Sequence, residues 1–192
     1  TGFGGSAEQV ALLTEWGLEK SVDHILDFEE VPGEAVEADD FDKDIMRPPT
    51  RDEREMYRAA QRSQDEDKLA QLREARQRRE QADRVQVGAM QRWWLKRMIE
   101  TPRPLEEKMT LFWHGLFATN YRTIENSYHM FLQNQLFRSQ AVGSYAALLK
   151  GIIRDPAMLA YLDNNDSKKG KPNENLAREI MELFSLGVGN YT

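Results

Sequence analysis

The chain has 192 residues, of which 40% are hydrophobic and 30% are charged, with a net charge of -6 and no cysteine. This length fits one globular unit with extensions, and a chain without cysteine has no disulfide framework, thiol nucleophile or thiolate metal site. The negative charge disfavours nonspecific nucleic-acid binding, and no run approaches the roughly 18 apolar residues that a membrane-spanning helix needs.

The first segment, residues 1–28, is predicted to be helical. Ser6 and Gln9 form a capping-box pattern that opens a helix over residues 7–16, and a second short helix follows over 18–28. Nine acidic residues then lie between positions 27 and 44 against the single Lys43, with Pro32 and Gly33 among them. This composition predicts an acidic linker over residues 29–49 with little order of its own.

Residues 50–86 are predicted to form a charged helical arm. Thr50 and Glu53 can form another capping box, and the chain then runs to Val87 without proline or glycine, rich in residues that favour a single helix. Apolar residues in the arm are sparse, so it is expected to project into solvent or to pair loosely with another helix. A partner-binding coiled coil is the alternative.

The helical pattern becomes apolar from Ala82 onward. Seven residues recur at helical spacing, so this part of the helix is predicted to enter the core and to end near residues 101–104: Ala82, Val85, Ala89, Met90, Trp93, Trp94 and Met98. Basic residues beside the two tryptophans raise a nucleic-acid surface as an alternative, but tryptophan at helical spacing is usually core.

The remaining segments are all predicted to be helical, over residues 105–117, 124–138, 144–153, 156–162 and 174–186. Pro104 and Pro156 fit first helical positions, and Asp155 fits an N-cap. No segment alternates with a period of two for long enough to indicate a strand. The predicted fold is therefore all-α, a multi-helix bundle whose core occupies residues 87–192.

The last predicted helix is amphipathic. Leu176, Ile180, Leu183 and Phe184 gather on one face at 100° per residue. The opposite face is polar and is either a ligand-binding face or an ordinary solvated one: Asn173, Glu174, Asn175, Arg178, Glu179 and Glu182.

The loop before that helix has a partial calcium-loop pattern. With Asp163 in position one, Glu174 falls in position twelve, but Lys168 stands where an EF-hand needs glycine. Three lysines also add positive charge where a cation would bind. A looser divalent site at Asp163 and Glu174 is a weaker alternative to a polar capping loop in which Asn173 is the N-cap.

Two further candidates lie in the predicted core. His114 falls opposite the expected apolar face of helix 105–117, formed by Leu105, Met109, Phe112, Trp113 and Leu116, and is therefore expected to be wet or hydrogen-bonded. The helix over residues 124–138 is apolar nearly all round, so Gln133, Asn134 and Arg138 need buried partners. Glu179 and Glu182 would suit Arg138, either as a structural network or as the floor of a polar pocket.

Several segments together resemble one bacterial family, domain of unknown function 1800: "TGFGGSAEQVALLTEWGLEKSVDHIL", "RWWLKRMIETPRPLEEKMTLFWHGLFATN", "QNQLFRSQAVGSYAALL", "RDPAMLAYLDN" and "KGKPNENLAREIMELFSLGVGNYT". The resemblance implies that the chain continues beyond Thr192 and that the protein is exported. It also implies a possible partner, the sulfatase-like family named domain of unknown function 1501, often encoded beside it. The family commonly has a second histidine where this chain has Leu116, which weakens a metal site there.

Two function classes follow. The first is an exported helical binding or scaffold domain with a buried Arg/Glu/Asn polar network. The second is a hydrolase in which Glu179 or Glu182 acts as general base or metal ligand and His114 or Arg138 assists. No cofactor is predicted, since no phosphate loop, zinc motif or dinucleotide fingerprint is present in the sequence. Catalysis requires His114, Arg138 and a carboxylate to meet at an open pocket, whereas scaffolding predicts closed pairs.

Overall fold

The computed structural model describes residues 3–32, 38 and 40–190, and over these residues the fold is all-α, as predicted. The described residues contain no strand, only an isolated bridge between Lys168 and Lys171. The helices are α1 (Ala7–Leu26), α2 (Arg51–Ser63), α3 (Glu66–Glu100), α4 (Pro104–Phe117), α5 (Tyr121–Ile124), α6 (Ser127–Ser139), α7 (Tyr145–Ile152), α8 (Pro156–Tyr161) and α9 (Asn175–Glu182). Two short 3-10 turns, η1 (Phe28–Glu30) and η2 (Asn164–Asp166), complete the set.

The N-terminal helix begins and divides where the sequence predicts. The Ser6 hydroxyl accepts the Gln9 N–H at 3.2 Å, and the Gln9 side chain accepts the Ser6 N–H at 3.0 Å. The two expected helices are the halves of α1, which is kinked at Gly17. Gly17 has φ 76°, a left-handed backbone that favours glycine, so the kink lies where a side chain would be strained.

The expected acidic linker falls partly on residues 33–37 and 39, which lie outside the described residues. Its later part packs on α3. Phe41 is buried, with its ring 6.0 Å from that of Trp93 and 4.9 Å from that of Phe131. The Asp42 N–H donates to the Gln86 side chain at 2.8 Å. An aromatic residue inside an acidic stretch is therefore a core contact in this chain.

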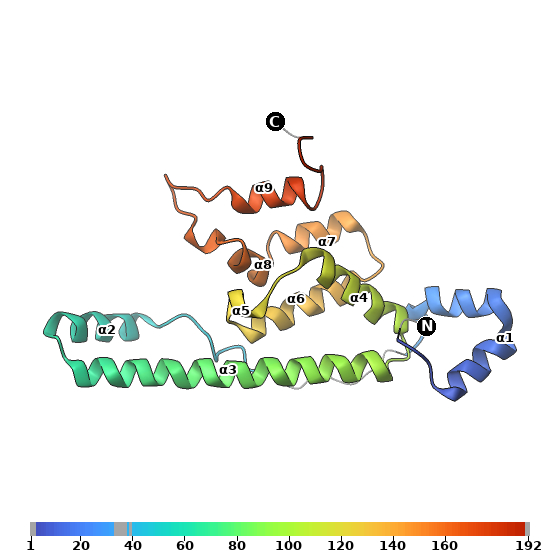
Figure 1. The fold of residues 1–192 in the computed structure, drawn as a ribbon, viewed down its shortest axis with the longest axis horizontal. Helices are drawn as coiled ribbons and strands as arrows, with labels where there is room; N and C mark the ends of the chain where they lie inside the picture. The colour runs from blue at the N-terminus through green and yellow to red at the C-terminus, as the bar shows by residue number, and fades with distance from the viewer. Residues whose placement is uncertain (1–2, 33–37, 39, 191–192) are drawn as a thin grey trace.

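The expected single helix from residue 50 to 87 is wrong, because the arm is a helical hairpin. Gln64 adopts a left-handed backbone with φ 53°, and the Asp65 side chain then caps α3 by accepting the Lys68 N–H at 3.0 Å. Ala60 and Leu69 are buried in the hairpin, where α2 packs beside α3 (Figure 1). Competition from an aspartate cap and burial of small apolar residues outweigh the helix propensity of the intervening sequence.

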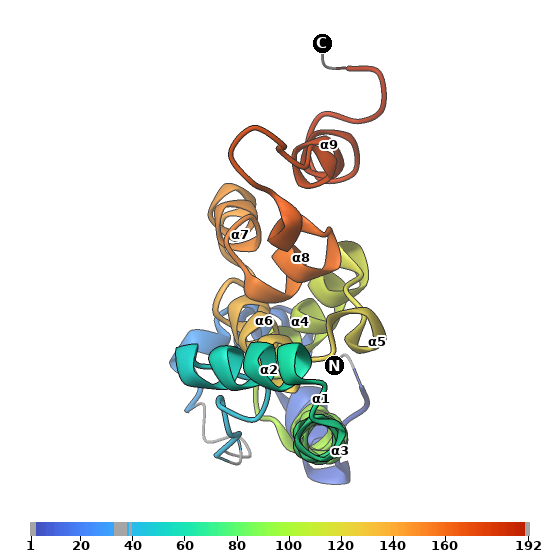
Figure 2. The same ribbon diagram turned by 90° about the vertical axis from the view of Figure 1, so that its left-hand side faces the viewer.

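The core helices are stacked on α3. In both views α3 lies at one side, α4 and α6 lie next to it, α7 and α8 follow, and α9 lies farthest away (Figures 1 and 2). The central element is α6, which contacts α3, α4, α5, α7 and α8. It begins at Ser127, three residues later than expected, because the Asn126 side chain caps it by accepting the His129 N–H at 3.0 Å.

Two apolar clusters lie along α6, one at its N-terminal half and one at its C-terminal half. The first joins α3 to α5, α6 and α8 through Val87, Met90, Trp93, Ile124, Met130 and Ala157. The second joins α4 to α6, α7 and α8 through Phe117, Phe137, Leu148, Ile152 and Met158. No helix among the described residues combines the length and the apolar character that crossing a bilayer requires.

Candidate functional site

The inward face of α4 is polar, which reverses part of the expected orientation. Phe112 and Leu116, assigned to the apolar face, are 54% and 39% exposed. Glu107 and Thr110, which precede His114 by seven and four residues and share its face, are fully buried. The cause is the ion pairing of Glu107, which requires this face of α4 to turn toward α3 and α6.

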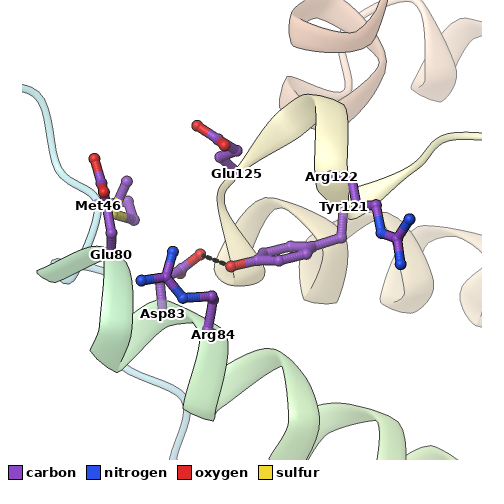
Figure 3. Close-up of a pocket in the computed structure, with 7 residues that line it drawn as sticks. All are labelled: Met46, Glu80, Asp83, Arg84, Tyr121, Arg122 and Glu125. Carbon is purple, nitrogen blue, oxygen red and sulfur yellow. Dashed lines mark hydrogen bonds between the residues drawn. The ribbon is translucent and has the colours of Figure 1, made fainter. Parts of the chain in front are cut away.

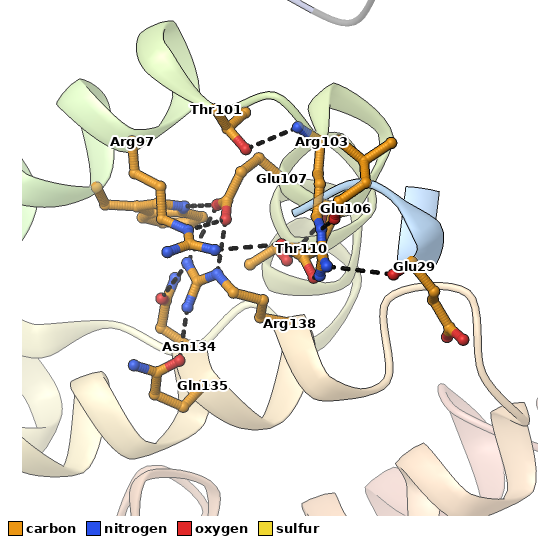
Figure 4. A network of polar contacts seen from close by, with 12 residues as sticks. Glu29, Arg97, Thr101, Arg103, Glu106, Glu107, Thr110, Asn134, Gln135 and Arg138 are labelled. Carbon is orange, nitrogen blue, oxygen red and sulfur yellow. Dashed lines mark hydrogen bonds and ion pairs between the residues drawn. The ribbon is translucent and has the colours of Figure 1, made fainter. Parts of the chain in front are cut away.

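Glu107 is the centre of a buried ion-pair network (Figure 4). Its two carboxylate oxygens accept from Arg138, from Nε at 2.6 Å and from Nη2 at 3.1 Å, which is a bidentate contact. Arg97 also donates its Nε–H to Glu107, and Trp94 donates its indole N–H at 2.9 Å. This carboxylate therefore receives charge-assisted hydrogen bonds from two other helices, α3 and α6.

The network extends toward the N-terminal segment. Glu106 accepts from Arg97 at 3.2 Å and lies 3.5 Å from Arg103. Arg103 in turn donates to the carbonyl oxygens of Val31 at 2.7 Å and of Glu29 at 3.4 Å. A chain of ion pairs and hydrogen bonds thus connects α6 to the turn that follows α1.

The charged residues of this network lie at the ends of helices. Glu106 and Glu107 lie in the first turn of α4, whereas Arg97 and Arg138 lie in the last turns of α3 and α6. The partial positive charge of a helix N-terminus favours carboxylates, and the partial negative charge of a C-terminus favours guanidinium groups. The network is therefore supported by the dipoles of three helices as well as by its own pairs.

The expected pairing of Arg138 with Glu179 or Glu182 is wrong. Within the described residues its ion-pair partner is Glu107, and its other hydrogen bonds go to Asn134 at 2.8 Å and Gln135 at 2.8 Å. The candidate Asn134 is buried, as expected, and its Nδ2 has no hydrogen-bond partner among the described residues. Arg138 fixes this orientation of Asn134, because a guanidinium can only donate.

Electrostatics keep Glu107 ionised. Burial alone would raise its pKa, but the hydrogen bonds and charges of Arg138 and Arg97 outweigh burial, so the pKa lies below its usual value. The guanidinium of Arg138 also lies 5.1 Å from the centre of the Trp93 ring, a cation–π distance.

His114, which was expected to be wet or hydrogen-bonded, is half-buried beside this network. Its ring makes edge contacts with Trp94 at 5.5 Å and Phe137 at 6.2 Å between centroids. Burial lowers its pKa, which favours the neutral ring at physiological pH. His114 therefore packs against Trp94, whose indole N–H bonds to Glu107, and against Phe137.

The polar face of α9 forms its own local contacts. Arg178 lies 3.4 Å from Glu174 and 3.6 Å from Glu179, and it donates to Asn175 at 2.6 Å. The N-cap of α9 is Glu174 and not Asn173 as expected, because α9 begins one position later; Asn173 precedes the cap and accepts the Asn175 N–H at 2.9 Å. In both overall views α7 and α8 lie between α9 and the layer of α4 and α6 (Figures 1 and 2).

The loop from Asp163 to Glu174 folds as a turn. Asp163 has φ 56°, Lys168 and Lys171 form the isolated bridge, and Gly170 between them has φ 87°. Glu174 is engaged by Arg178. Among the residues that the structure describes, no group of three or more acidic or histidine side chains is arranged to hold a metal ion.

A second buried carboxylate, Asp83, fastens α6 to α3. It accepts from the Ser127 N–H at 2.9 Å, the Ser127 hydroxyl at 2.6 Å and the Tyr121 hydroxyl at 2.8 Å. A small pocket of about 180 Å³ opens beside it, with Glu80, Arg84 and Tyr121 in its wall (Figure 3). The hydrogen bonds of Asp83 are made to the protein itself, so its role here is to anchor.

A third buried carboxylate, Asp155, links α6 to α8. As predicted it caps α8, by accepting the Met158 N–H at 2.8 Å, and it also accepts from Gln133 at 2.7 Å. The Thr119 hydroxyl donates to the other end of Gln133. Burial raises the pKa of Asp155 to about 6, despite the opposing hydrogen bonds from Met158 and Gln133.

Arg97, Glu107 and Asp83 form buried polar contacts that were not predicted from the sequence. Asp83 precedes Val87, Met90 and Trp93 at spacings of four, three and three, so it shares their buried stripe. This helical spacing could have predicted the burial of Asp83. Val85, which was predicted to belong to the buried stripe, is 60% exposed. Glu107 had no comparable signal, since acidic residues in a first helical turn are usually solvated.

The family model described as Protein of unknown function (DUF1800) matches residues 1–192 of this chain. No curated protein and no solved structure matches it. The chain therefore belongs to the DUF1800 family, as its sequence segments suggest.

Proposed function

We propose that this member of the DUF1800 family is a helical binding or scaffold domain of an exported bacterial protein. The observation that supports this best is the closed pairing of Glu107 with Arg138 and Arg97. This buried cluster of charges joins α4 to α6 and α3. A buried carboxylate whose oxygens are taken by guanidinium groups is poorly placed to accept a substrate proton.

The hydrolase alternative required His114, Arg138 and a carboxylate of α9 at one open pocket. Arg138 instead pairs with Glu107, and His114 lies against aromatic rings. Glu179 and Glu182 lie on α9, and Glu179 pairs with a neighbour on the same helix. These separate placements favour binding over hydrolysis.

The arm of residues 50–86 is proposed as the partner-facing part, and residues 87–192 as the core that carries it. The hairpin of α2 and α3 extends beyond the stacked core helices (Figure 1), so it is available to a second protein. Family resemblance supports export, and it suggests the sulfatase-like family 1501 protein as a partner.

Sedimentation velocity of the full-length protein mixed with a sulfatase-like protein of family 1501 tests this proposal. A complex is expected, and cell fractionation is expected to place both proteins outside the cytoplasm. Hydrolysis of an ester, phosphate or peptide substrate that is lost in Glu179→Gln or Glu182→Gln, with unchanged stability, would contradict it. If no complex forms, the proposal that the sulfatase-like family supplies the partner is wrong.

A further inference from the structure

A groove of about 770 Å³ lies between α2 and α3 and carries a concentrated positive charge. Among the described residues, seven arginines line it, and Glu53 is the one acidic residue of that lining. The whole chain has a net charge of -6, so this surface differs sharply from the average. Its volume is within the range of about 300–1,000 Å³ that is usual for ligand sites.

Three of the seven arginines are already paired. Arg47 holds Glu53 through two contacts of 2.8 Å. Arg76 contacts Glu80, and Arg78 contacts Glu74, in pairs along α3. The acidic partners in these pairs belong to the hairpin itself, so these three arginines are already neutralised.

The other four arginines form no ion pair with any described residue: Arg54, Arg58, Arg73 and Arg79. Arg79 provides an independent observation. Its Nη1 is buried and has no hydrogen-bond partner among the described residues. A buried guanidinium donor without an acceptor is destabilising, so the charge of Arg79 at the groove wall is left without an ion-pair partner among the described residues.

The groove also has apolar lining. Tyr57, which is 48% exposed, lies in it together with Leu72 and Pro49. A tyrosine ring beside guanidinium groups offers a surface on which an apolar or aromatic side chain can pack. A groove with both features can bind an anionic group and an apolar side chain of the same ligand.

We propose that this groove binds an acidic peptide segment of a partner protein, with an apolar side chain between its carboxylates. This rests on the proposed binding role and assigns it a surface. Arg54 and Arg58 are four residues apart on α2, a separation of about 6 Å along the axis. Carboxylates four apart on a helix, or two apart on an extended strand at about 7 Å, match that separation.

A peptide fits the groove better than a nucleic acid does. A nucleic acid would extend past the groove and meet the field of a chain whose net charge is -6. Guanidinium forks bind carboxylates in bidentate fashion, which is the contact that the glutamates of an acidic peptide would make here.

Fluorescence anisotropy with the full-length protein tests the proposal. The probe is a fluorescein-labelled synthetic peptide in which glutamate and tyrosine alternate, and the control probe has glutamine in place of glutamate. The variant Arg54→Gln/Arg58→Gln is expected to weaken binding of the acidic probe by about tenfold or more, the effect of losing charged hydrogen bonds. The matched control Arg51→Gln/Arg62→Gln makes the same charge change on the same helix, outside the groove lining, and is expected to bind as the wild type does.

Several results would overturn the proposal. These are no binding of the acidic probe, equal binding of the glutamine probe, an equal loss in both double variants, or tighter binding of single-stranded DNA at the same ionic strength. Self-association of the wild type that Arg54→Gln/Arg58→Gln abolishes would assign the groove to a second copy instead. If the complex with the sulfatase-like protein forms normally in this variant, the groove proposal fails and the binding role stands.

Discussion

Replacing Glu107 by glutamine should remove a large part of the free energy of unfolding of this domain. The substitution keeps the size of the side chain but removes the counter-charge of Arg138 and Arg97, whose side chains are only 8% and 13% exposed. The new amide N–H groups would also face the donors of Arg138, Arg97 and Trp94. Removing one partner of a buried ion pair costs about 3–5 kcal/mol, against a total stability of about 5–15 kcal/mol.

Urea unfolding followed by far-UV circular dichroism measures this loss. Glu174→Gln is the matched control, since it makes the same chemical change to an ion pair of 3.4 Å whose glutamate is 84% exposed. The control is expected to lose no more than about 0.5 kcal/mol. Arg138→Lys, which keeps the charge but loses the bidentate fork, should fall between the two and serves if Glu107→Gln does not fold.

The pKa of Glu107 gives the same prediction a pH signature. Its pKa is lowered in the folded state, so its contribution is present above the unfolded carboxylate pKa of about 4.3 and is lost as pH falls through the folded value. The stability gap between wild type and Glu107→Gln should therefore narrow in acid. Equal stabilities of Glu107→Gln and Glu174→Gln at neutral pH would show that the network does not hold the three helices together.

Three further changes test other buried contacts. The pKa of Asp155 is raised to about 6, so its proton favours the folded state below pH 4 and this contribution is lost as pH rises through 6. In urea unfolding as a function of pH, Asp155→Asn should therefore gain about 3 kcal/mol relative to wild type between pH 4 and 7, and parallel profiles would contradict this. Asp83→Ala should cost about 3 kcal/mol in the same measurement, because the Ser127 N–H and the Tyr121 hydroxyl lose their acceptor; an unchanged midpoint would contradict its anchoring role. Phe41→Ala should cost about 3–5 kcal/mol with a change in tryptophan fluorescence, whereas a detached linker predicts no effect.

Local signals in the sequence predicted the fold class and many helix ends. The caps at Ser6, Thr50 and Asp155 are formed as expected, because a cap depends on residues within three positions of each other. Gly17 and Pro104 likewise act through their own backbone conformations.

The break in the arm was missed because it depends on packing. Asp65 is a local capping signal, but Asp67 carries the same signal without ending a helix. The turn at Gln64 is also stabilised by burial of Ala60 and Leu69 in the hairpin. Tertiary contacts of this kind outweigh propensity differences, which amount to less than about 1 kcal/mol per residue.

The centre of the polar network was missed for a related reason. The sequence shows that Arg138 needs a buried acceptor, but it does not show which of the many glutamates supplies it. Glu107 meets Arg138 across 31 positions of sequence, through the packing of α4 on α6. The apolar residues of α4, including Phe112, predicted the opposite orientation of the helix. That prediction failed because the ion pairs of Glu107, and not the apolar area, decide which face of α4 turns inward.

Thermal unfolding of the full-length protein with and without a panel of divalent ions separates a structural polar network from a metal-dependent reaction centre. Wild type and the double variant Glu179→Gln/Glu182→Gln should have midpoints that the ions do not raise and that differ by no more than about 2–4 °C, the effect of about 1 kcal/mol in a chain of this size. A ligand that binds the native state must raise its midpoint. An ion-dependent rise in the wild type that disappears in the double variant would contradict the scaffold role and would place a metal site on α9.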